Sequence, residues 1–292
     1  MKKVILITGT SSGLGLSLAV KLAADGHTVY ASMRELSKAA ALKEAMDAEG
    51  TSYHIVPLDV ESKESVDSAI QTIITEQGKI DCLINNAGLG FVNTLEHTSE
   101  EQIQKIMDIN FMGVVRTTKA VIPHMREANQ GQIINLSSVG GLVGQPFNEI
   151  YCAAKFAVEG FTESLASYLK TFNIQFTAVE PGGIASEFIN NVFKNHQAPT
   201  FEQDEQYTNL FTQYVSSAQN RANSEQNSVY QTSDEVADCI MDVINSDNPP
   251  LRIRTSAWAE EFCELKTKAD PTGNESVKKV YQRFLGAEEK IV

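Results

Sequence analysis

Short apolar runs alternate with longer amphipathic stretches along most of the chain. Apolar runs that end at glycine, proline or asparagine predict buried strands, and apolar residues at helical spacing predict helices. Strands are expected at about residues 4–7, 28–33, 53–58, 82–84, 132–136, 175–179 and 251–255. Helices are expected at about residues 16–24, 37–49, 64–76, 100–126, 150–170 and 233–244, and Ser233 is expected to cap the last of them.

This alternation indicates repeated strand–helix–strand units. Such units build a parallel sheet with helices on both faces, joined by right-handed crossovers. We therefore predict an α/β fold of the Rossmann type, with a doubly wound parallel sheet of about seven strands. A length of 292 residues is compatible with one elaborated domain, so residues 1–292 are expected to form a single unit.

Two segments depart from the alternating pattern. Residues 190–232 are rich in Asn, Gln, Ser and acidic residues with aromatic residues interspersed, and they predict a helical lid over a substrate cleft. The aromatic side chains of this segment either line a substrate pocket or only pack the lid. Residues 256–292 predict a helical C-terminal extension, whose aromatic residues favour packing or a subunit contact.

The formal net charge of -13 narrows the range of partners. A chain this acidic repels the phosphates of nucleic acids and the headgroups of anionic lipids, so we expect neither a nucleic acid nor a membrane as partner. No stretch is long and apolar enough to cross a membrane. The four cysteines and five histidines form no metal-binding pattern. We therefore expect free thiols, no metal site and a cytoplasmic location.

The first predicted strand leads into the sequence Thr-Gly-Thr-Ser-Ser-Gly-Leu-Gly at residues 8–15. Glycines at this place allow a positive φ and let a pyrophosphate approach the backbone, while the following helix offers free N–H groups. The turn could also be only a tight connection between a strand and a helix. Its position after the first strand favours a dinucleotide site made by Gly9, Ser11, Ser12, Gly13, Leu14 and Gly15.

The end of the second predicted strand carries Arg34 followed by Glu35. An acidic residue at this place hydrogen-bonds a ribose hydroxyl of NAD, whereas an arginine pairs with the 2′-phosphate of NADP. Arg34 lies nineteen residues after Gly15, where the discriminating side chain is expected. The sequence favours NADP(H) over NAD(H), although Glu35 could serve the hydroxyl and Arg34 could be a solvated surface residue.

Ser138, Tyr151 and Lys155 are the candidate catalytic residues. Tyr151 and Lys155 are four residues apart on a predicted helix and so share a face. A neighbouring ammonium favours the phenolate and is expected to lower the pKa of Tyr151 from about 10 toward the working pH. Ser138, thirteen residues upstream at a strand end, is placed to hold a carbonyl oxygen while Tyr151 transfers the proton.

Taken together, the motifs resemble those of the short-chain dehydrogenase/reductase family over about residues 3–188. The similarity rests on Gly9, Gly13, Gly15, Asp59, Val60, Asn85, Asn86, Ala87, Gly88, Asn110, Ser138, Tyr151, Lys155, Pro181 and Gly182. The sequences at 30–34 and 179–182 resemble the branch that contains 17β-hydroxysteroid and retinol dehydrogenases. This likeness does not by itself identify a substrate.

The resemblance also implies roles for the matching residues. Cofactor contacts are implied for Asp59 and Val60 at the adenine, for Asn86, Ala87 and Gly88 along the cofactor, and for Pro181, Gly182, Ile184 and Ser186 at the nicotinamide. Ser186 stands where the family usually has threonine, and its hydroxyl is expected to keep the carboxamide contact. Asn110 is expected to hold a water in a proton relay through Lys155, which should also bind the nicotinamide ribose.

These patterns predict an NADP(H)-dependent oxidoreductase that interconverts a ketone or aldehyde and an alcohol of a small molecule, with Tyr151 as general acid–base. One alternative is a catalytically silent NADP(H)-binding regulator, which would have no need of the proton-relay residues. An isomerase or dehydratase that uses the same tyrosine is another. The family resemblance further implies a homodimer or homotetramer, built on the helices at about 100–126 and 150–170.

Overall fold

The structure is a computed structural model that describes residues 2–184, 204–222 and 230–285 of the chain. Seven strands form one sheet in the order β3-β2-β1-β4-β5-β6-β9, and each neighbouring pair is parallel. These strands are β1 (Val4–Thr8), β2 (Thr28–Met33), β3 (His54–Pro57), β4 (Cys82–Asn85), β5 (Gly131–Leu136), β6 (Ile174–Glu180) and β9 (Arg252–Arg254). The sheet confirms the predicted doubly wound α/β fold.

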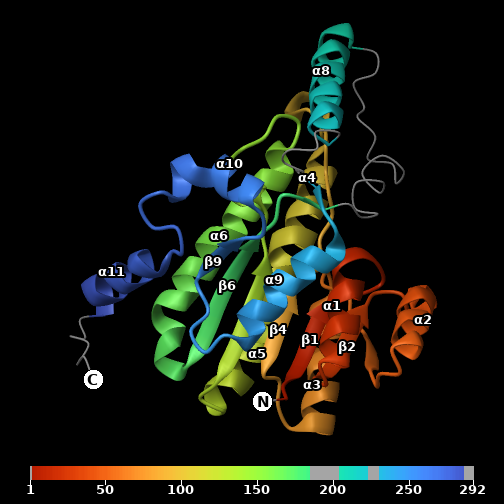
Figure 1. Cartoon of the computed structure of the whole chain (residues 1–292), viewed down its shortest axis with the longest axis vertical. Coiled ribbons are helices and arrows are strands. Elements are labelled where there is room, and N and C mark those ends of the chain that lie inside the picture. Colours follow the sequence, from red (N-terminus) through yellow and green to blue (C-terminus); the bar gives the residue numbers. More distant parts are fainter. Residues whose placement is uncertain (1, 185–203, 223–229, 286–292) are drawn as a thin grey trace.

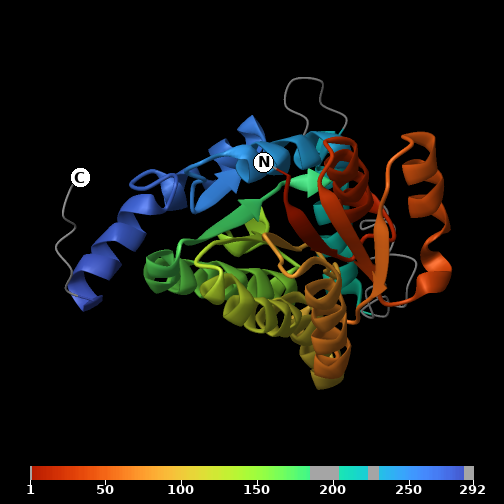
Figure 2. The same cartoon turned by 90° about the horizontal axis from the view of Figure 1, so that it is seen from below.

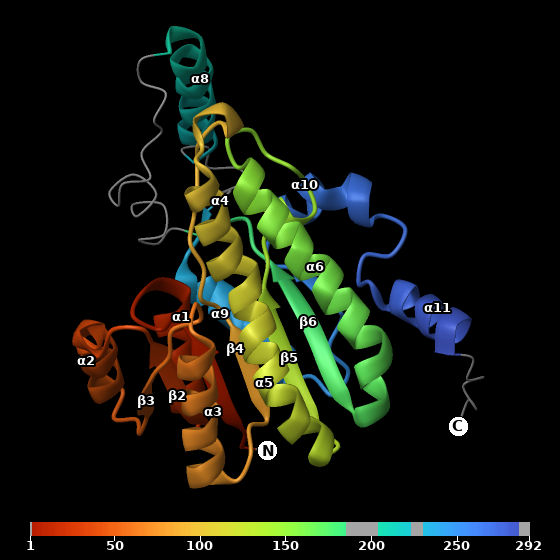
Figure 3. The same cartoon turned by 180° about the vertical axis from the view of Figure 1, so that it is seen from behind.

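Helices cover both faces of the sheet (Figures 2 and 3). The helices are α1 (Gly13–Ala24), α2 (Ala40–Ala48), α3 (Lys63–Gln77), α4 (Glu100–Met107), α5 (Gly113–Glu127), α6 (Glu149–Leu169), α8 (Glu205–Ala222), α9 (Ser233–Asn245), α10 (Ala257–Thr267) and α11 (Asn274–Leu285). On one face, Ile5 and Ile7 pack with side chains of α1, α2 and α9. On the other, Leu6 packs with side chains of α3, α5 and α6. Successive residues of a strand point to opposite faces, so continuous apolar strands are what this two-sided core requires.

Two expected helices differ in detail. The helix expected at 100–126 is divided by a π-helical turn at Asp108–Met112, which separates α4 from α5. The cap of α9 is Thr232, and the expectation that Ser233 caps it is wrong. The Thr232 hydroxyl accepts a hydrogen bond from the Glu235 N–H, and the Glu235 carboxylate accepts one from the Thr232 N–H. Such a reciprocal capping box satisfies two free donors, whereas a single polar residue satisfies one.

Two helical regions extend beyond the sheet (Figure 1). α8 lies within the segment expected to form a lid and projects past the carboxyl ends of the strands. Residues 190–203 and 223–229 of that segment lie outside the described residues. A second, two-stranded sheet joins β7 (Gly183–Ile184) to β8 (Tyr230–Gln231). α10 and α11 form the expected helical extension after β9. Among the residues with described positions, no helix has the length and apolar character needed to span a membrane.

Candidate active site

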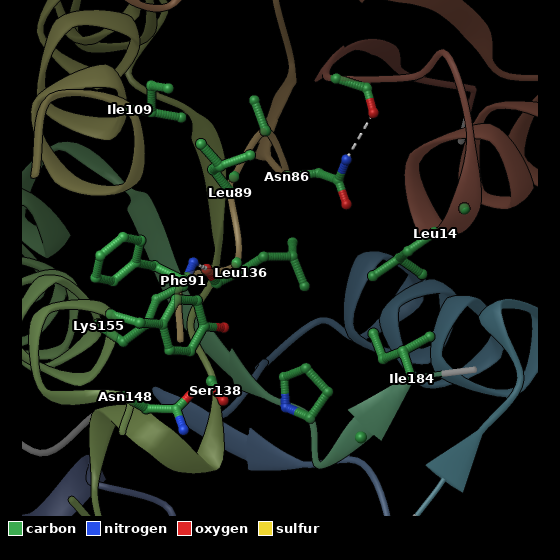
Figure 4. A pocket seen from close by; sticks show the side chains of 18 of the residues that line it. Leu14, Asn86, Leu89, Phe91, Ile109, Leu136, Ser138, Asn148, Lys155 and Ile184 are labelled. Atoms are coloured by element: carbon green, nitrogen blue, oxygen red, sulfur yellow. Dashed lines mark hydrogen bonds between the residues drawn. The ribbon is translucent and has the colours of Figure 1, made fainter. Parts of the chain in front are cut away.

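One large cleft opens at the carboxyl ends of β1, β4, β5 and β6 (Figure 4). Its volume is about 1490 Å³. The chain order of the strands reverses between β1 and β4, and ligands of open α/β sheets bind at such a reversal. Ser138 and Lys155 lie on one side of the cavity, and Leu14 and Ile184 lie across from them. The glycine-rich turn and the candidate catalytic residues therefore face the same space.

The turn between β1 and α1 has the backbone geometry that its glycines allow. Gly9 and Gly13 have φ values of 72° and 58°, in the left-handed region that favours glycine. A methyl group at Gly15 would lie 2.2 Å from the Gly9 carbonyl oxygen, so the turn closes only with glycine there. Ser11, Ser12 and Leu14 also line the cleft beside the N-terminus of α1. This arrangement suits a pyrophosphate, because unpaired N–H groups and the helix dipole both favour an anion.

Arg34 borders the cleft just after β2. Its guanidinium lies 3.2 Å from the Glu35 carboxylate and 3.5 Å from that of Glu61. The Arg34 side chain is 53% exposed, so it can pair with a further anion. Lys38 lines the same end of the cleft and is held 2.9 Å from Glu35. Two cations therefore border the end of the cleft where the sequence predicts the cofactor-discriminating side chain.

The expected adenine and sheet-centre residues also line this cleft. They are Asp59, Val60, Asn86, Ala87 and Gly88. The Asn86 side chain donates hydrogen bonds to the carbonyl oxygens of Thr8 and Gly9, each at 2.9 Å. Asn86 thus connects the end of β4 to the end of β1 and holds the start of the glycine-rich turn in place.

Ser138, Tyr151 and Lys155 come together on the catalytic side of the cleft. Ser138 follows β5, and its hydroxyl accepts a hydrogen bond from the Gly140 N–H at 3.0 Å. The hydroxyls of Ser138 and Tyr151 also interact. The Lys155 ammonium donates to the Leu136 carbonyl at 2.7 Å and lies 5.7 Å from the centroid of the Tyr151 ring. The β5 carbonyl therefore anchors the lysine beside the tyrosine.

The pKa values of this group differ from the sequence expectation. Burial raises the pKa of Tyr151 to about 12, although the hydrogen bond with Ser138 opposes the rise. Burial also lowers the pKa of Lys155 to about 8, and the charge of Glu159 opposes that shift. The expectation that Lys155 lowers the pKa of Tyr151 is wrong for the protein without bound cofactor. The ammonium binds Leu136 and lies over the phenol ring, so loss of water around the phenol outweighs its charge.

Asn110 lies in the π-helical turn and is fully buried. Its side-chain amide accepts a hydrogen bond from the Leu89 N–H at 2.7 Å and donates one to the Leu89 carbonyl at 2.8 Å. A methyl group at Gly88 would lie 3.3 Å from Asn110 Oδ1 and 3.8 Å from Lys155 Nζ, so these three residues converge. The expected role of Asn110 in a water relay stays a prediction.

The nicotinamide end of the expected site is described only in part. Pro181, Gly182, Gly183 and Ile184 line the cleft after β6. Gly183 is packed against the Tyr230 ring, which lies 2.7 Å from where a methyl group would stand. Ser186 lies outside the described residues.

The outer part of the cleft contains residues that the sequence analysis did not assign to the site. They include Phe91, Gln145, Phe147, Asn148, Leu210, Trp258 and Phe262. Tyr214, one of the aromatic residues expected either to line a pocket or to pack a lid, also lines the cleft. Phe147 has a φ of 62°, which is strained for a bulky side chain, and such strain is common at functional sites. Its ring contacts Phe211 and Tyr214 of α8. No sequence signal marks a phenylalanine for this conformation, because α8 and the loop before α6 meet only in the folded chain.

A family model for short chain dehydrogenases matches residues 3–197, which is more than half of the chain. The chain belongs to the short-chain dehydrogenase family. Membership in this dehydrogenase family makes it an oxidoreductase that binds a nicotinamide cofactor and acts on the CH–OH group of a small molecule. The resemblance inferred from the motifs is thereby confirmed.

Similar proteins include members of the branch that the short motifs indicated. Retinol dehydrogenase 8 of Bos taurus is 41% identical over 278 residues, which cover 93% of this chain and 87% of that protein. Human 17-beta-hydroxysteroid dehydrogenase type 1 is 35% identical over 295 residues, which cover 98% of this chain and 87% of that protein. A 3-ketodihydrosphingosine reductase of Bacteroides thetaiotaomicron is 37% identical over 252 residues, covering 86% of this chain and 87% of that protein.

Solved structures of this short-chain dehydrogenase's relatives share the fold. A short-chain dehydrogenase from Streptomyces avermitilis has a TM-score of 0.75 at 26% identity, covering 97% of this chain and 99% of that one. A gluconate 5-dehydrogenase from Burkholderia cenocepacia in complex with NADP and tartrate has a TM-score of 0.67 at 26% identity, covering 82% and 87%.

Proposed function

We propose that this protein is an NADP(H)-dependent dehydrogenase/reductase that interconverts a carbonyl and an alcohol, with Tyr151 as the general acid–base. The observation that carries the proposal is the convergence of Ser138, Tyr151 and Lys155 in the cleft that also holds the glycine-rich turn. The three side chains come from the end of β5 and from α6, so rigid elements hold them.

In the reductive direction the chain's own residues bind the carbonyl oxygen and supply a proton. Ser138 accepts from Gly140 and interacts with the Tyr151 hydroxyl, and its hydroxyl hydrogen can be donated to the substrate oxygen when a carbonyl binds. Tyr151 is protonated at neutral pH, because burial raises its pKa to about 12, and it donates its proton to that oxygen. When bound, NADPH supplies the hydride for the carbonyl carbon. Lys155 holds the nicotinamide ribose, and with Asn110 it relays a proton back to Tyr151.

NADP(H) is the proposed cofactor because Arg34 and Lys38 border the cleft beyond β2. Guanidinium and phosphate pair through two parallel hydrogen bonds, which an exposed Arg34 can offer. Glu35 and Glu61 hold the guanidinium in place from two sides. If Glu35 bound a ribose hydroxyl instead, NADH would bind as well as NADPH.

The proposed substrate carries an extended apolar body. Aromatic side chains from the loop before α6, from α8 and from α10 line the outer cleft, and such surfaces bind apolar ligands. The names of the similar proteins refer to retinol, 17-beta-hydroxysteroids and 3-ketodihydrosphingosine. Bulky apolar alcohols and ketones are therefore the first substrates to test.

We also propose a cytoplasmic protein that self-associates through α5 and α6. Partly exposed apolar side chains of this region, Met112, Phe156, Tyr168 and Phe172, support the association. The free thiols support the location, because a reducing compartment preserves them.

The catalytic role is tested by Tyr151→Phe. Turnover with NADPH is expected to fall by about 10²- to 10⁴-fold, while NADPH affinity measured by fluorescence stays unchanged. Tyr53→Phe is the control, because Tyr53 lies just before β3 and is not among the residues that line the cleft. Full turnover in Tyr151→Phe would contradict the mechanism. Tight NADPH binding by the wild type without turnover of any ketone, aldehyde or alcohol would favour the silent regulator.

The cofactor preference is tested by Arg34→Ala. Wild-type protein is expected to bind NADPH at least about tenfold more tightly than NADH, a difference of about 1.4 kcal/mol. The variant should lose this difference by weaker NADPH binding, with NADH affinity unchanged. Arg126→Ala, an exposed arginine near the end of α5, is the control. Equal affinities for both cofactors in the wild type would overturn the NADP(H) assignment.

A further inference from the structure

Two buried carboxyl groups lie behind the candidate catalytic residues, outside the cleft. Glu159 follows Lys155 by four residues on α6, and Glu180 is the last residue of β6, directly before Pro181. Glu180 is 0% exposed and Glu159 is 9% exposed. Buried carboxylates are costly without a partner, so their presence here needs a physical account.

The arginines of β9 neutralise this region only in part. Arg254 donates to Glu180 at 3.1 Å, and Arg252 lies 3.9 Å from the other Glu180 oxygen. Each arginine also pairs with a more exposed carboxylate, Arg252 with Glu163 at 3.2 Å and Arg254 with Glu260 at 2.8 Å. The arginines thus divide their charge among several partners.

Glu159 makes no ion pair within the described part of the chain. Its Oε1, the Oε1 of Glu180 and the Oγ of Ser137 are buried oxygens without a direct hydrogen bond of normal geometry among the described residues. Ser137 and Glu180 nonetheless lie close enough to the Glu159 carboxyl to influence its pKa. A methyl group at Gly141 would be 2.5 Å from Ser137 Oγ and 3.1 Å from Glu159 Cγ, so these side chains meet beneath Gly141.

We propose that Glu159 and Glu180 share a single proton in this buried region, and that the pair is a positioning device for Lys155. With one shared proton, the protonated carboxyl becomes an O–H donor. It can then donate a hydrogen bond to a buried oxygen of the other carboxyl, which otherwise lacks a hydrogen-bond donor. It also removes the repulsion between two adjacent carboxylates, as in other buried carboxyl pairs.

The charges of the surrounding elements fit one shared proton. The groups that face the pair are Lys155 and Glu163 of α6, Arg252 and Arg254 of β9, and Glu260 and Cys263 of α10. The Cys263 thiol is neutral, because burial raises its pKa to about 12. Three cations therefore oppose four carboxyl groups, counting the pair, and one proton balances them. Consistent with this, burial raises the pKa of Glu159 and, with the Glu159 charge, raises that of Glu180 to about 8.

The pair acts on Lys155 through charge, and this part of the inference rests on the proposed function. Burial lowers the pKa of Lys155 to about 8, and Glu159 is the neighbour that opposes the shift. The negative charge of the pair therefore keeps Lys155 an ammonium, which its hydrogen bond to Leu136 and its proposed relay both use.

The shared proton is tested by unfolding between pH 5 and pH 9, which requires no catalysis. Burial and the neighbouring carboxyl raise the folded pKa of Glu180 from about 4.5 to about 8, so the proton stabilises the folded protein fully below about pH 4.5. This stabilisation is lost progressively as pH rises from about 4.5 to about 8, and the free energy of unfolding levels off above that pH. Glu159→Gln and Glu180→Gln should each abolish this loss, because the remaining carboxyl then has arginine neighbours and no carboxylate beside it. Glu163→Gln, the same change one turn further along α6, should retain it. If the free energy of unfolding of Glu159→Gln or Glu180→Gln depended on pH as it does in the wild type, the shared proton would be ruled out.

Infrared spectroscopy of the wild type tests the proton directly, even where a variant does not fold. A carboxylic acid has a C=O stretch distinct from that of a carboxylate. At pH 7 the protein should show one buried carboxylic-acid band, which disappears as pH is raised beyond about 8. Absence of the band at pH 7 would refute the shared proton.

The link to Lys155 is tested by the pH profile of carbonyl reduction. In Glu159→Gln the alkaline limb of kcat should move to lower pH by about one unit, while KM for NADPH near neutral pH stays the same. Glu163→Gln should leave the profile unchanged. An unshifted limb in Glu159→Gln would overturn the role toward Lys155. If the wild type shows no turnover, the proposed function fails, while the unfolding and infrared results still decide whether the proton is shared.

Discussion

At the scale of single residues, Gly141 packs so closely against its neighbours behind the cleft that it leaves no room for a methyl group. Besides Ser137 Oγ at 2.5 Å, an added methyl group would meet the Lys155 carbonyl oxygen at 3.1 Å, and that backbone atom cannot move freely. Gly141→Ala should therefore lower the free energy of unfolding by about 1–3 kcal/mol through overpacking. Urea titration measures this change. Gly160→Ala is the control, because Gly160 lies on α6 with no atom within 4 Å of an added methyl group.

Gly160→Ala should instead stabilise the protein by up to about 1 kcal/mol, since alanine is the better helix former. Equal stabilities of the wild type and Gly141→Ala would mean that Ser137 and Glu159 can move aside at no cost.

The site residues that lie close together in the sequence could be predicted as neighbours. Those brought together from distant segments of the chain could not. Tyr151 and Lys155 are four apart on one helix, so their proximity follows from helical geometry. Glu159 and Glu180 are a pair only because α6 packs against β6. Asn135 of β5 likewise has partners from distant segments, because it accepts a hydrogen bond from Asn85 of β4 and donates one to Thr162 of α6.

At the scale of elements, the capping box of α9 gives the sharpest prediction. Thr232→Ala removes the side chain that accepts from Glu235 and should cost about 1 kcal/mol in the free energy of unfolding. Ser233→Ala is the control, because Ser233 is the first helical residue and not the cap, so its change should be near zero. Thermal or urea unfolding compares the two variants. A larger loss in Ser233→Ala would restore the cap that the sequence suggested.

Most elements were predictable because their apolar period is local to each segment. The buried strands and the long helices lie within a few residues of the expected ranges. The interruption between α4 and α5 was not predictable. The apolar pattern continues across Asp108–Met112, and the reason for the turn lies in Asn110, whose amide bonds the Leu89 backbone from another part of the chain. A π-helical turn at a candidate functional residue is a common association.

At the scale of the molecule, the sheet was predictable but the outer cleft was not. Alternating strands and helices imply a parallel sheet with a site at its carboxyl edge. The shape of the substrate end depends on how α8 and α10 lie over that edge. Phe147 contacts Phe211 of α8, and Trp258 stacks on Phe262 within α10. The contact with Phe211 could not be inferred from spacing along the chain, because it depends on how α8 packs against the loop before α6. Trp258 and Phe262 are four residues apart on one helix, so their stacking follows from helical spacing, but the spacing does not show that α10 lines the cleft.

The cofactor site unites segments from residue 9 to residue 184, so its occupancy should stabilise the whole fold. A ligand that binds only the folded state at a hundredfold excess over its Kd adds about 2.7 kcal/mol to the free energy of unfolding. For a chain of this length, NADPH should raise Tm by roughly 4 °C, and further with concentration. Differential scanning fluorimetry with NADPH measures this shift. ATP is the control, because it is an anionic nucleotide without the nicotinamide half.

The specificity of the shift distinguishes a built cofactor site from a general effect of polyanions. ATP has no nicotinamide half to reach the side of the cleft that holds Ser138, Tyr151 and Lys155, so it should bind more weakly and leave Tm nearly unchanged. The protein's acidic surface reinforces this expectation, since a net charge of -13 disfavours anions that gain no specific contacts. Equal shifts with both ligands, or none with NADPH, would contradict the assignment of this cleft to the dinucleotide.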